Sequence, residues 1–346
     1  VRQRHARVRE LLQLHHPGQA GQLLFGEEPV AASAVPHPLS GASPRALTLP
    51  EIQKIQVAFV TGARVAQMAG ADGVELHGAH GYLINSFLSP YLNRRDDDYG
   101  GSLENRLRFL LEILAGIREV CGRTFPLGVR ISAEEFLGDQ GNDLATSCRI
   151  AEELEKAGVD FLDISCTIPE TPPESALACI EPGTYEQGWK KYMAAEIKKH
   201  VKIPVIAVAN IKEPGVAEEI LREGCCDLVG VARGHLADPA WCNKAKSGRA
   251  EMIRKCIGCL VCINEIFHHR HVKCSVNPTT GREREFARPE RNGAGRTIAV
   301  IGGGPAGLTA AMVLKERGFH PVLFDAARRL GGTLNVADKG IGKDKI

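Results

Sequence analysis

Residues 125–165, FPLGVRISAEEFLGDQGNDLATSCRIAEELEKAGVDFLDIS, contain two short apolar runs with an amphipathic stretch between them. The runs at 125–132 and 160–165 predict buried strands. Residues 142–157 carry apolar side chains at three- and four-residue spacing, which predicts a helix. A strand, a helix and a second strand in this order predict one repeat of a parallel βα sheet.

The same alternation runs from the start of the chain to about residue 245. Strands are predicted at 8–14, 72–77, 125–132, 160–165, 203–210 and 227–233. Helices are predicted near 48–70, 102–121, 142–157, 186–200, 213–223 and 238–247, and Ser102 is expected to cap the second of them. A closed barrel of this kind needs eight strands and about 250 residues. The sequence therefore predicts an α/β fold with an incomplete TIM (β/α)8 barrel of about six strands, and the missing strands are expected at the front of the chain.

The composition favours a small-molecule partner. Among 346 residues, 43 are basic and 41 acidic, and this near-neutral balance gives no electrostatic case for binding nucleic acid or an anionic membrane. No apolar run approaches the roughly 18 residues that span a bilayer, and the N-terminus has no apolar signal core. Most of the 11 cysteines are scattered among apolar neighbours, as in reduced cytosolic proteins. We expect a soluble cytoplasmic protein, and the sequence leaves a homo-oligomer open.

Changes in the pattern divide the chain into four predicted segments. Residues 1–250 are expected to form the barrel, truncated at its N-terminal end, and residues 251–280 a cysteine-rich segment. Residues 281–295 are polar and rich in turn-forming residues, which predicts a linker. Residues 296–346 begin with a strand, a glycine-rich turn, a helix and a second strand. This order predicts the start of a Rossmann-like FAD/NAD(P)-binding domain that is cut short at residue 346.

Four cysteines lie within nineteen positions in CIGCLVCINEIFHHRHVKC, residues 256–274. Three thiolates in one tight loop and a fourth from farther along the chain favour a 4Fe-4S cluster. Its expected ligands are Cys256, Cys259, Cys262 and Cys274. A structural zinc site, which usually pairs two separate C-x2-C knuckles, and thiols without metal are the alternatives. The intervening histidines at 268, 269 and 271 are expected in a solvated loop rather than on metal.

A glycine motif opens the last segment. In VIGGGPAG, the glycines follow the apolar run TIAVI and precede a predicted helix, which is the context of a dinucleotide-binding turn. Gly302 would permit the tight turn, Gly304 would let the backbone approach a pyrophosphate, and Gly307 would allow close packing of helix and strand. Asp325 is expected to accept a hydrogen bond from a ribose hydroxyl. A purely structural glycine turn is the alternative.

Polar residues gather where the strand at 72–77 ends. His77 is its last residue and His80 and Tyr82 follow closely. Catalytic groups of such barrels sit at the carboxyl ends of the strands. Two imidazoles can stabilise negative charge on a substrate carbonyl oxygen, and a phenol can deliver a proton. Helix capping and simple packing are the alternative roles for these side chains.

Two further polar residues interrupt apolar strands: Gln13 and Arg130. A buried arginine needs a partner. Either an internal carboxylate such as Asp163 or an electron-rich cofactor can supply it.

Three stretches together resemble the Old Yellow Enzyme-like flavin oxidoreductases that carry an iron-sulfur segment. They are HGAHGYLINSFLSPYLNRRDDDYGGSLENRLRFLLEI from 77, CIGCLVC with CSVNPTTGRE from 256 and 274, and AVIGGGPAGL from 299. This group includes 2,4-dienoyl-CoA reductase, 2-enoate reductase, bile-acid-inducible flavin oxidoreductases and trimethylamine dehydrogenase. The resemblance covers nearly the whole chain.

The resemblance implies roles for individual residues. Gln13 would bond the pyrimidine edge of FMN, and Arg130 would balance charge beside it. His77 and His80 would bind the substrate carbonyl, and Tyr82 would donate a proton. The FMN phosphate would lie at the loops after the last two strands, around Ala209, Asn210, Ala232 and Arg233. Two departures from the family pattern argue for weaker FMN retention: Gln19 replaces a usual arginine, and alanines replace the usual glycines at 209 and 232.

The resemblance also implies an activity. The intact protein would be an NAD(P)H-dependent reductase of activated carbon-carbon double bonds, in which electrons pass from FAD through the 4Fe-4S cluster to FMN. One alternative keeps the flavins and reverses the flow, oxidising an amine or a saturated acyl thioester. The others are a truncated, non-catalytic product that only binds a cluster, and a cluster-based redox sensor.

Overall fold

The structure is a computed structural model that describes residues 8–21, 26, 28–38, 41–172, 175, 178–286, 290–337 and 339. The chain divides into two compact units. The first contains residues 1–181 and 185–232, and the second contains residues 182–184 and 233–346. The predicted segment boundaries at 250, 280 and 295 stay predictions. Residues 1–7 of the predicted barrel, 287–289 of the predicted linker and 340–346 of the predicted Rossmann segment lie outside the described residues.

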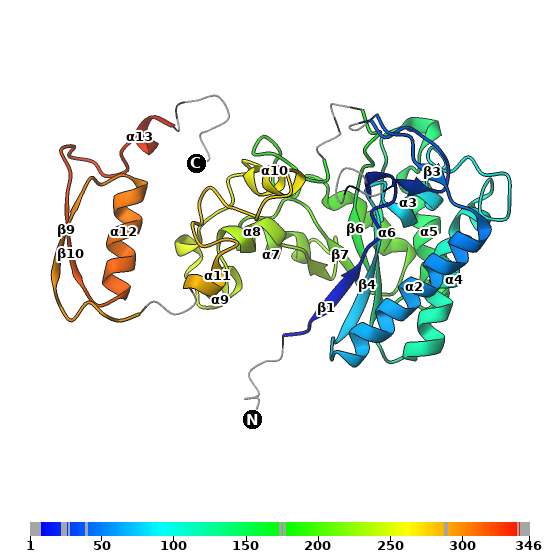
Figure 1. The fold of residues 1–346 in the computed structure, drawn as a ribbon, viewed down its shortest axis with the longest axis horizontal. Helices are drawn as coiled ribbons and strands as arrows, with labels where there is room; N and C mark the ends of the chain where they lie inside the picture. Colours follow the sequence, from blue (N-terminus) through cyan, green and yellow to red (C-terminus); the bar gives the residue numbers. More distant parts are fainter. Residues whose placement is uncertain are drawn as a thin grey trace. The chain divides into compact units, whose positions relative to one another are not determined.

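The first unit is built on a six-stranded parallel sheet in the order β1-β4-β5-β6-β7-β8 (Figure 1). These strands are β1 (Leu11–Leu14), β4 (Gly73–Gly78), β5 (Leu127–Ser132), β6 (Phe161–Ser165), β7 (Val205–Ala207) and β8 (Leu228–Val229). Each falls within, or within one residue of, a predicted strand. Strands that neighbour each other in sequence also neighbour each other in the sheet, which is the arrangement of a partial (β/α) barrel.

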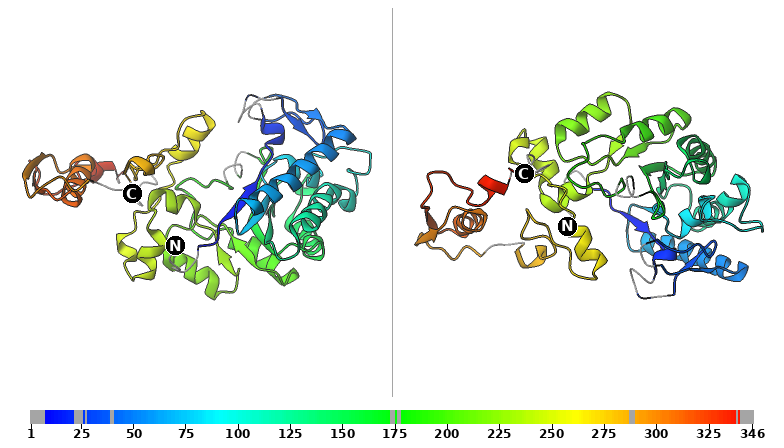
Figure 2. Two further views of the ribbon diagram at one scale, coloured as in Figure 1. Left: turned by 60° about the horizontal axis from the view of Figure 1, so that its bottom comes forward. Right: turned by 90° about the horizontal axis from the view of Figure 1, so that it is seen from above.

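Side chains alternate between the two faces of this sheet, as the pleat requires. Apolar residues such as Val74, Leu76 and Leu162, each 0% exposed, occupy one set of positions. Polar residues occupy the other set. The helices lie outside the strands (Figure 2): α2 (Leu49–Met68), α4 (Leu103–Cys121), α5 (Leu144–Lys156), α6 (Lys191–His200) and α7 (Pro214–Arg222). Covering the apolar face with helices leaves the polar face for a binding site.

Helices α2, α4 and α5 begin at side chains that help to satisfy the first backbone N–H groups of the helix. Ser102 Oγ accepts a hydrogen bond from the Asn105 N–H at 3.3 Å, as predicted for the start of α4. Asp143 Oδ1 accepts from the Thr146 N–H at 2.8 Å and caps α5. Thr48 begins α2 with a capping box. The cap at Ser102 explains why the start of α4 could be predicted closely, whereas α6, which has no capping side chain, begins at Lys191 and not at the predicted residue 186.

The structure contains short elements that the sequence pattern did not predict. Helix α3 (Leu83–Leu88) follows the site residues at the end of β4. The predicted strand at 227–233 is wrong at its end. Strand β8 stops at Val229, and helix α8 (Ala232–Ala237) begins within the last two residues of the predicted strand. The segments β2 (Val30–Ala31) and β3 (Arg45–Ala46) form a small separate parallel pair. Such elements are too short to show hydrophobic periodicity.

The second unit contains α9 (Trp241–Lys246), the cysteine-rich segment with α10 (Val261–Phe267), and α11 (Glu283–Phe286). The predicted strand, turn, helix and strand follow as β9 (Thr297–Ile301), α12 (Pro305–Glu316) and β10 (His320–Phe324), with α13 (Leu334–Ala337) beyond. Strands β9 and β10 pair in parallel, as a βαβ unit requires. Among the described residues, no helix combines the length and the apolar content needed to cross a bilayer.

Candidate active site at the carboxyl ends of the strands

His77, His80 and Tyr82 meet at the end of β4. The ring centroid of His77 lies 5.0 Å from those of both His80 and Tyr82, and the His80 and Tyr82 centroids are 6.4 Å apart. The ring of His15, which follows β1, completes this group at 4.3 Å from Tyr82 and 5.2 Å from His77. The structure therefore brings the three predicted catalytic residues together and adds a fourth ring.

The backbone at His80 is held in an uncommon conformation. His80 has φ +62° and Gly81 has φ +73°, both in the left-handed region. A Cβ on Gly81 would lie 2.4 Å from Pro169 Cδ, so only glycine lets the loop after β6 approach this turn. Ser132 Oγ accepts from the His80 N–H at 3.0 Å, and His80 Nε2 lies 2.7 Å from Ser165 Oγ. Serines from two strands, β5 and β6, thus fix the position of His80 and of its ring.

Burial sets the protonation of these groups. Burial and the Arg130 guanidinium lower the pKa of His77 to about 3. The same causes lower the pKa of His80 well below its usual range. Burial, then the Cys179 thiol, raise the pKa of Tyr82. At neutral pH the site therefore presents two neutral imidazoles and a protonated phenol.

Below this group lies a set of polar side chains from four neighbouring strands, three of them ionisable. Gln13 Nε2 donates to Glu75 Oε1 at 2.5 Å. Arg130 Nε lies 3.7 Å from Asp163 Oδ2, which makes an ion pair without a hydrogen bond. Burial, then the Asp163 carboxyl, raise the pKa of Glu75 to about 7. Two carboxyl groups around one guanidinium in a buried site favour retention of a proton by one of them.

A fully buried ion pair lies behind the site. Lys190 Nζ is 2.7 Å from Glu181 Oε1, and both side chains are 2% exposed. Lys190 also donates to the Ala178 carbonyl at 2.9 Å, which ties the loop after β6 to the start of α6. Buried charges are tolerated when they are paired and hydrogen-bonded in this way.

Several of these residues were missed in the sequence. They are His15, Glu75, Ser132, Ser165, Lys190 and Glu181. For the first four, a signal existed: each lies two positions from a residue already singled out, Gln13, His77, Arg130 or Asp163, and side chains two apart on a strand share a face. Lys190 and Glu181 lie outside the strands, so no such periodicity marks them.

The structure supports the fit of a flavin at this face. Arg130 Nε and His77 Nδ1 are buried and have no hydrogen-bond partner among the described residues. The Arg130 N–H needs an acceptor, and His77 Nδ1 needs an acceptor or a donor, depending on its tautomer. A flavin ring system offers both. Arg130 already has Asp163 as its charge partner, so the two partners expected for it are compatible rather than exclusive.

The four residues predicted around the FMN phosphate differ in their burial, backbone conformation and place in the fold. Ala209 is 0% exposed at the end of β7, and Asn210, rather than either alanine, has a left-handed backbone, with φ +54°. Asn210 Nδ2 donates to the Tyr185 carbonyl at 3.0 Å. Ala232 begins α8, and Arg233 belongs to the second unit.

The four cysteines of the predicted cluster line one small cavity in the second unit. Cys256, Cys259, Cys262 and Cys274 share its lining with Arg233 and five apolar or glycine residues. Among the described residues, no three Cys, His, Asp or Glu side chains are placed to share a single metal ion. Four thiols around a common space are the donor set that a 4Fe-4S cluster needs, and the zinc alternative uses the same donors. The histidines at 268, 269 and 271 are exposed and absent from the lining, as expected of a solvated loop.

The glycine turn has the predicted geometry. Gly302 has φ +103°, and a Cβ on Gly307 would lie 1.8 Å from the Gly302 carbonyl oxygen, so helix and strand approach closely there. Gly304 is the N-cap of α12. Asp325 Oδ2 accepts from the Gly303 N–H at 2.5 Å and so braces the turn itself. Its predicted contact with a ribose stays a prediction.

Comparisons with known proteins agree with this architecture. Residues 4–252 match the NADH:flavin oxidoreductase / NADH oxidase family, and residues 300–339 match an NAD(P)-binding Rossmann-like domain. The chain is 46% identical over 339 residues to the NADH oxidase of Thermoanaerobacter brockii, covering 97% of this chain and 51% of that protein. The chain spans about half the length of the curated relatives it matches.

Solved structures show the same fold. A 2-naphthoyl-CoA reductase in complex with 2-naphthoyl-CoA superposes with a TM-score of 0.89 at 30% identity, over 96% of this chain and 52% of that one. Histamine dehydrogenase from Rhizobium sp. 4-9 superposes with a TM-score of 0.84 at 33% identity, over 96% and 48%. Because the family match covers most of the first unit and its residues form the expected parallel sheet, the chain belongs to the NADH:flavin oxidoreductase / NADH oxidase family of flavin-dependent oxidoreductases.

Proposed function

We propose that the protein reduces the carbon-carbon double bond of α,β-unsaturated carbonyl compounds, of the enoate or enoyl-thioester type, with electrons from NAD(P)H. The observation that carries the proposal is the convergence of His77, His80 and Tyr82 at one strand end, with the imidazoles neutral and the phenol protonated. These side chains can serve two atoms of an enone: the carbonyl oxygen, which needs hydrogen-bond donors, and the α-carbon, which needs a proton.

The imidazoles suit the carbonyl end. His77 and His80 present N–H groups that can donate to the carbonyl oxygen and stabilise the negative charge that develops on it. The hydroxyl of Tyr82 can then deliver a proton to the α-carbon, because its raised pKa keeps the proton available at neutral pH. Ser165 keeps the His80 ring in place through its contact with Nε2. Bound FMN would supply hydride to the β-carbon. A 4Fe-4S cluster would carry single electrons from FAD to the FMN.

The proposal assigns each group to residues of this chain. Gln13 and Arg130 would hold the FMN ring, and the loops at Ala209, Asn210, Ala232 and Arg233 its phosphate. The four clustered cysteines would hold the 4Fe-4S cluster. Gly302, Gly304, Gly307 and Asp325 would begin the FAD site. We also propose a small-molecule substrate and a cytoplasmic location.

The likeness to 2-naphthoyl-CoA reductase and NADH oxidase supports reduction by a pyridine nucleotide. The likeness to histamine dehydrogenase at 33% identity supports a second candidate, oxidation of an amine at the same site. The two candidates differ in what the phenol must do, because amine oxidation requires no proton donor to carbon.

Replacing Tyr82 tests the proposal directly. In the intact flavoenzyme, Tyr82→Phe is expected to leave flavin reduction by NAD(P)H unchanged and to slow reoxidation by an enoate by about 10²- to 10⁴-fold, the usual contribution of a general acid. Stopped-flow absorbance separates the two phases. Tyr192→Phe, at a tyrosine that is 47% exposed, is the control and should match the wild type. Reoxidation at the wild-type rate in Tyr82→Phe would rule out the phenol as the acid.

A further inference from the structure

One residue, Gly81, separates His80 from Tyr82, and both of its backbone polar groups are held by buried side chains. The Gly81 N–H donates to Asn85 Oδ1 at 2.8 Å, and the Gly81 carbonyl oxygen accepts from Gln19 Nε2 at 3.2 Å. Asn85 and Gln19 are each 2% exposed. Because the chain from His80 to Tyr82 runs through Gly81 alone, these two bonds set how the imidazole and the phenol lie relative to each other.

The amide of Asn85 has a second partner that determines its orientation. Asn85 Nδ2 donates to Glu135 Oε1 at 3.2 Å, and Glu135, on the loop after β5, is 0% exposed. Burial raises the pKa of Glu135 to about 6, so at neutral pH the carboxyl is mainly ionised and accepts hydrogen bonds without donating any. Asn85 satisfies both neighbours only with its oxygen toward Gly81 and its nitrogen toward Glu135. The carboxylate therefore keeps an acceptor in front of the Gly81 N–H.

Further hydrogen bonds hold Glu135 itself in place. Ser89 Oγ donates to Glu135 Oε2 at 2.8 Å, and the Asn142 N–H donates to the same oxygen at 3.0 Å. Helix α3 begins after its N-cap Tyr82 and ends at its C-cap Ser89. A buried carboxylate is tolerated when such bonds replace its water. Glu135 thus fixes the helix that follows the proton donor.

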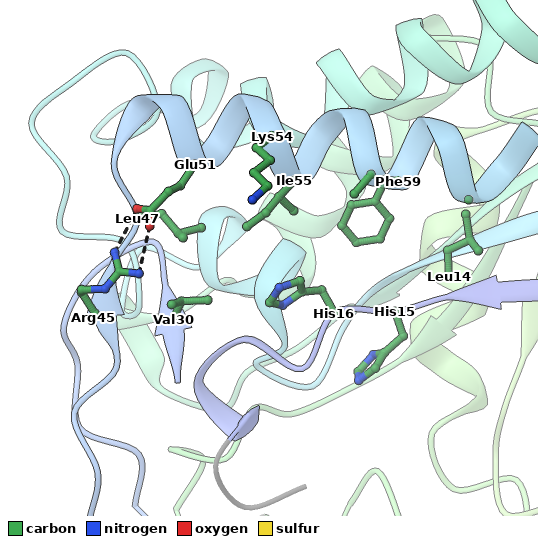
Figure 3. A pocket seen from close by; sticks show the side chains of 12 residues that line it. Leu14, His15, His16, Val30, Arg45, Leu47, Glu51, Lys54, Ile55 and Phe59 are labelled. Atoms are coloured by element: carbon green, nitrogen blue, oxygen red, sulfur yellow. Dashed lines mark hydrogen bonds and ion pairs between the residues drawn. The ribbon is translucent and has the colours of Figure 1, made fainter. Parts of the chain in front are cut away.

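The side chains that hold this turn do not line the open cavity of about 460 Å³ beneath α2. The lining of that cavity includes Phe59 (Figure 3). Gln19, Asn85 and Glu135 are absent from it. The three side chains therefore act through their bonds to the turn at Gly81 and not as a wall of this cavity.

We propose that Glu135 is a positioning residue that acts through Asn85 and Gly81. It holds the Tyr82 ring where the phenol can protonate a substrate carbon. The proposal rests on the proposed function, in which Tyr82 is the acid. Displacing a reacting group by about 1 Å can slow a reaction on the order of 10²-fold. Loss of the Glu135 carboxylate should therefore slow protonation of an enoate, whereas flavin reduction by NAD(P)H, which does not use Tyr82, should be unchanged.

Exchanging donor and acceptor between two side chains tests this role. Glu135→Gln keeps the size of the side chain but sets an NH2 group against Asn85 Nδ2 when its oxygen stays with the two other donors. In stopped-flow experiments on the intact flavoenzyme, reoxidation by an enoate should slow by about ten-fold or more. The double variant Glu135→Gln/Asn85→Asp again pairs a donor with an acceptor and leaves an oxygen for the Gly81 N–H. Its rate should return to within about three-fold of the wild type, whereas a packing role predicts no such repair.

Hydrogen exchange at the Gly81 amide is a second readout, and it does not depend on activity. Mass spectrometry of peptides that contain residue 81 should show faster exchange in Glu135→Gln and wild-type exchange in the double variant. A wild-type enzyme that reduces no enoate would contradict the proposed function alone. Unchanged exchange in Glu135→Gln would contradict the positioning role.

The matched control is Glu134→Gln, at the neighbouring position of the same loop. The Glu134 carboxylate accepts hydrogen bonds from the Phe136 N–H at 3.3 Å and the Leu144 N–H at 3.1 Å, and neither of these groups belongs to α3. This variant should keep the wild-type reoxidation rate and the wild-type exchange at Gly81.

A wild-type reoxidation rate in Glu135→Gln, or a double variant as slow as Glu135→Gln, would overturn the positioning role. If Glu135→Gln does not fold, Asn85→Ala takes its place. Asn85→Ala removes the acceptor of the Gly81 N–H and leaves the carboxylate bound to its other donors. It should be slow in reoxidation and fast in exchange at Gly81, and wild-type values for both would overturn the proposal equally.

Discussion

Burial explains why the imidazoles of His77 and His80 are neutral and the phenol of Tyr82 is protonated, because it disfavours the charged form of each group. The position of His80 is fixed from outside by two serines, one on β5 and one on β6, through its backbone N–H and its Nε2. The catalytic geometry is thus a property of three strands and not of the β4 loop alone. Rotations of the His80 ring that would break its bond to Ser165 are disfavoured.

Glu75 gives a prediction about pH. Its native pKa is about 7 against an ordinary value of 4.5, so between these values the native state binds more protons than the unfolded state. Stability therefore falls as the pH rises from about 4.5 to 7 and levels off above pH 7. Glu75→Gln should remove about 3 kcal/mol of this fall, since the pKa is raised from 4.5 to about 7 and one pKa unit corresponds to about 1.4 kcal/mol.

Urea unfolding at a series of pH values measures this dependence. Glu119→Gln, at an exposed position of α4, is the matched control and should follow the wild type. If Glu75→Gln and wild type change in parallel from pH 4.5 to 7, the carboxyl is not held protonated by the native site.

The meeting of His77, His80 and Tyr82 was predictable because strand position determines it. All three lie at or just beyond one strand end, and carboxyl ends of parallel strands share one edge. Contacts between strands were not predictable in the same way. The bonds of Gln13 to Glu75 and of His80 to Ser165 join residues 62 and 85 positions apart, and their pairing depends on sheet register. The buried pair of Lys190 and Glu181 depends on a loop conformation that no periodicity encodes.

Strands and long helices were predicted well because their side chains repeat with a clear period. The six strands and helices such as α4 lie where the apolar pattern places them. The error at α8 has a physical reason: β8 has only two residues in the ladder, and an apolar run that continues into a short helix looks the same in sequence. The end of a strand is therefore the least predictable part of the site, although it carries the loops that hold ligands.

The loop that carries Cys256 and Cys259 and leads into α10, where Cys262 lies, depends on one glycine. Gly258 has φ +64°, and a Cβ there would lie 2.5 Å from the Gly183 nitrogen, so the loop would have to move. Gly258→Ala should lower the iron and acid-labile sulfide bound per chain by at least half. Gly248→Ala is the matched control, because Gly248 has a similar φ of +70° and a Cβ there would have no described atom within 4 Å. Equal iron in the two variants would show that the observed loop is not the one that binds metal.

Taken as a whole, the chain joins a flavin-type parallel sheet to a cysteine cavity and the first βαβ unit of a nucleotide-binding fold. The relatives it matches are about twice as long. Their activities divide between reductases and amine dehydrogenases, so fold alone does not determine the direction of electron flow. The cluster of His77, His80 and Tyr82, in which Tyr82 is the proposed proton donor, is what favours reduction.

The direction can be measured in a single anaerobic experiment on the intact flavoenzyme. The flavin is first reduced with NADH or NADPH, and an α,β-unsaturated thioester, an aromatic enone or a secondary amine is then added while the visible spectrum is followed. We predict that an unsaturated compound restores the oxidised flavin spectrum and yields one equivalent of saturated product, whereas the amine has no effect. Reduced flavin that persists with every unsaturated compound, together with bleaching of the oxidised enzyme by the amine, would contradict the proposed reduction.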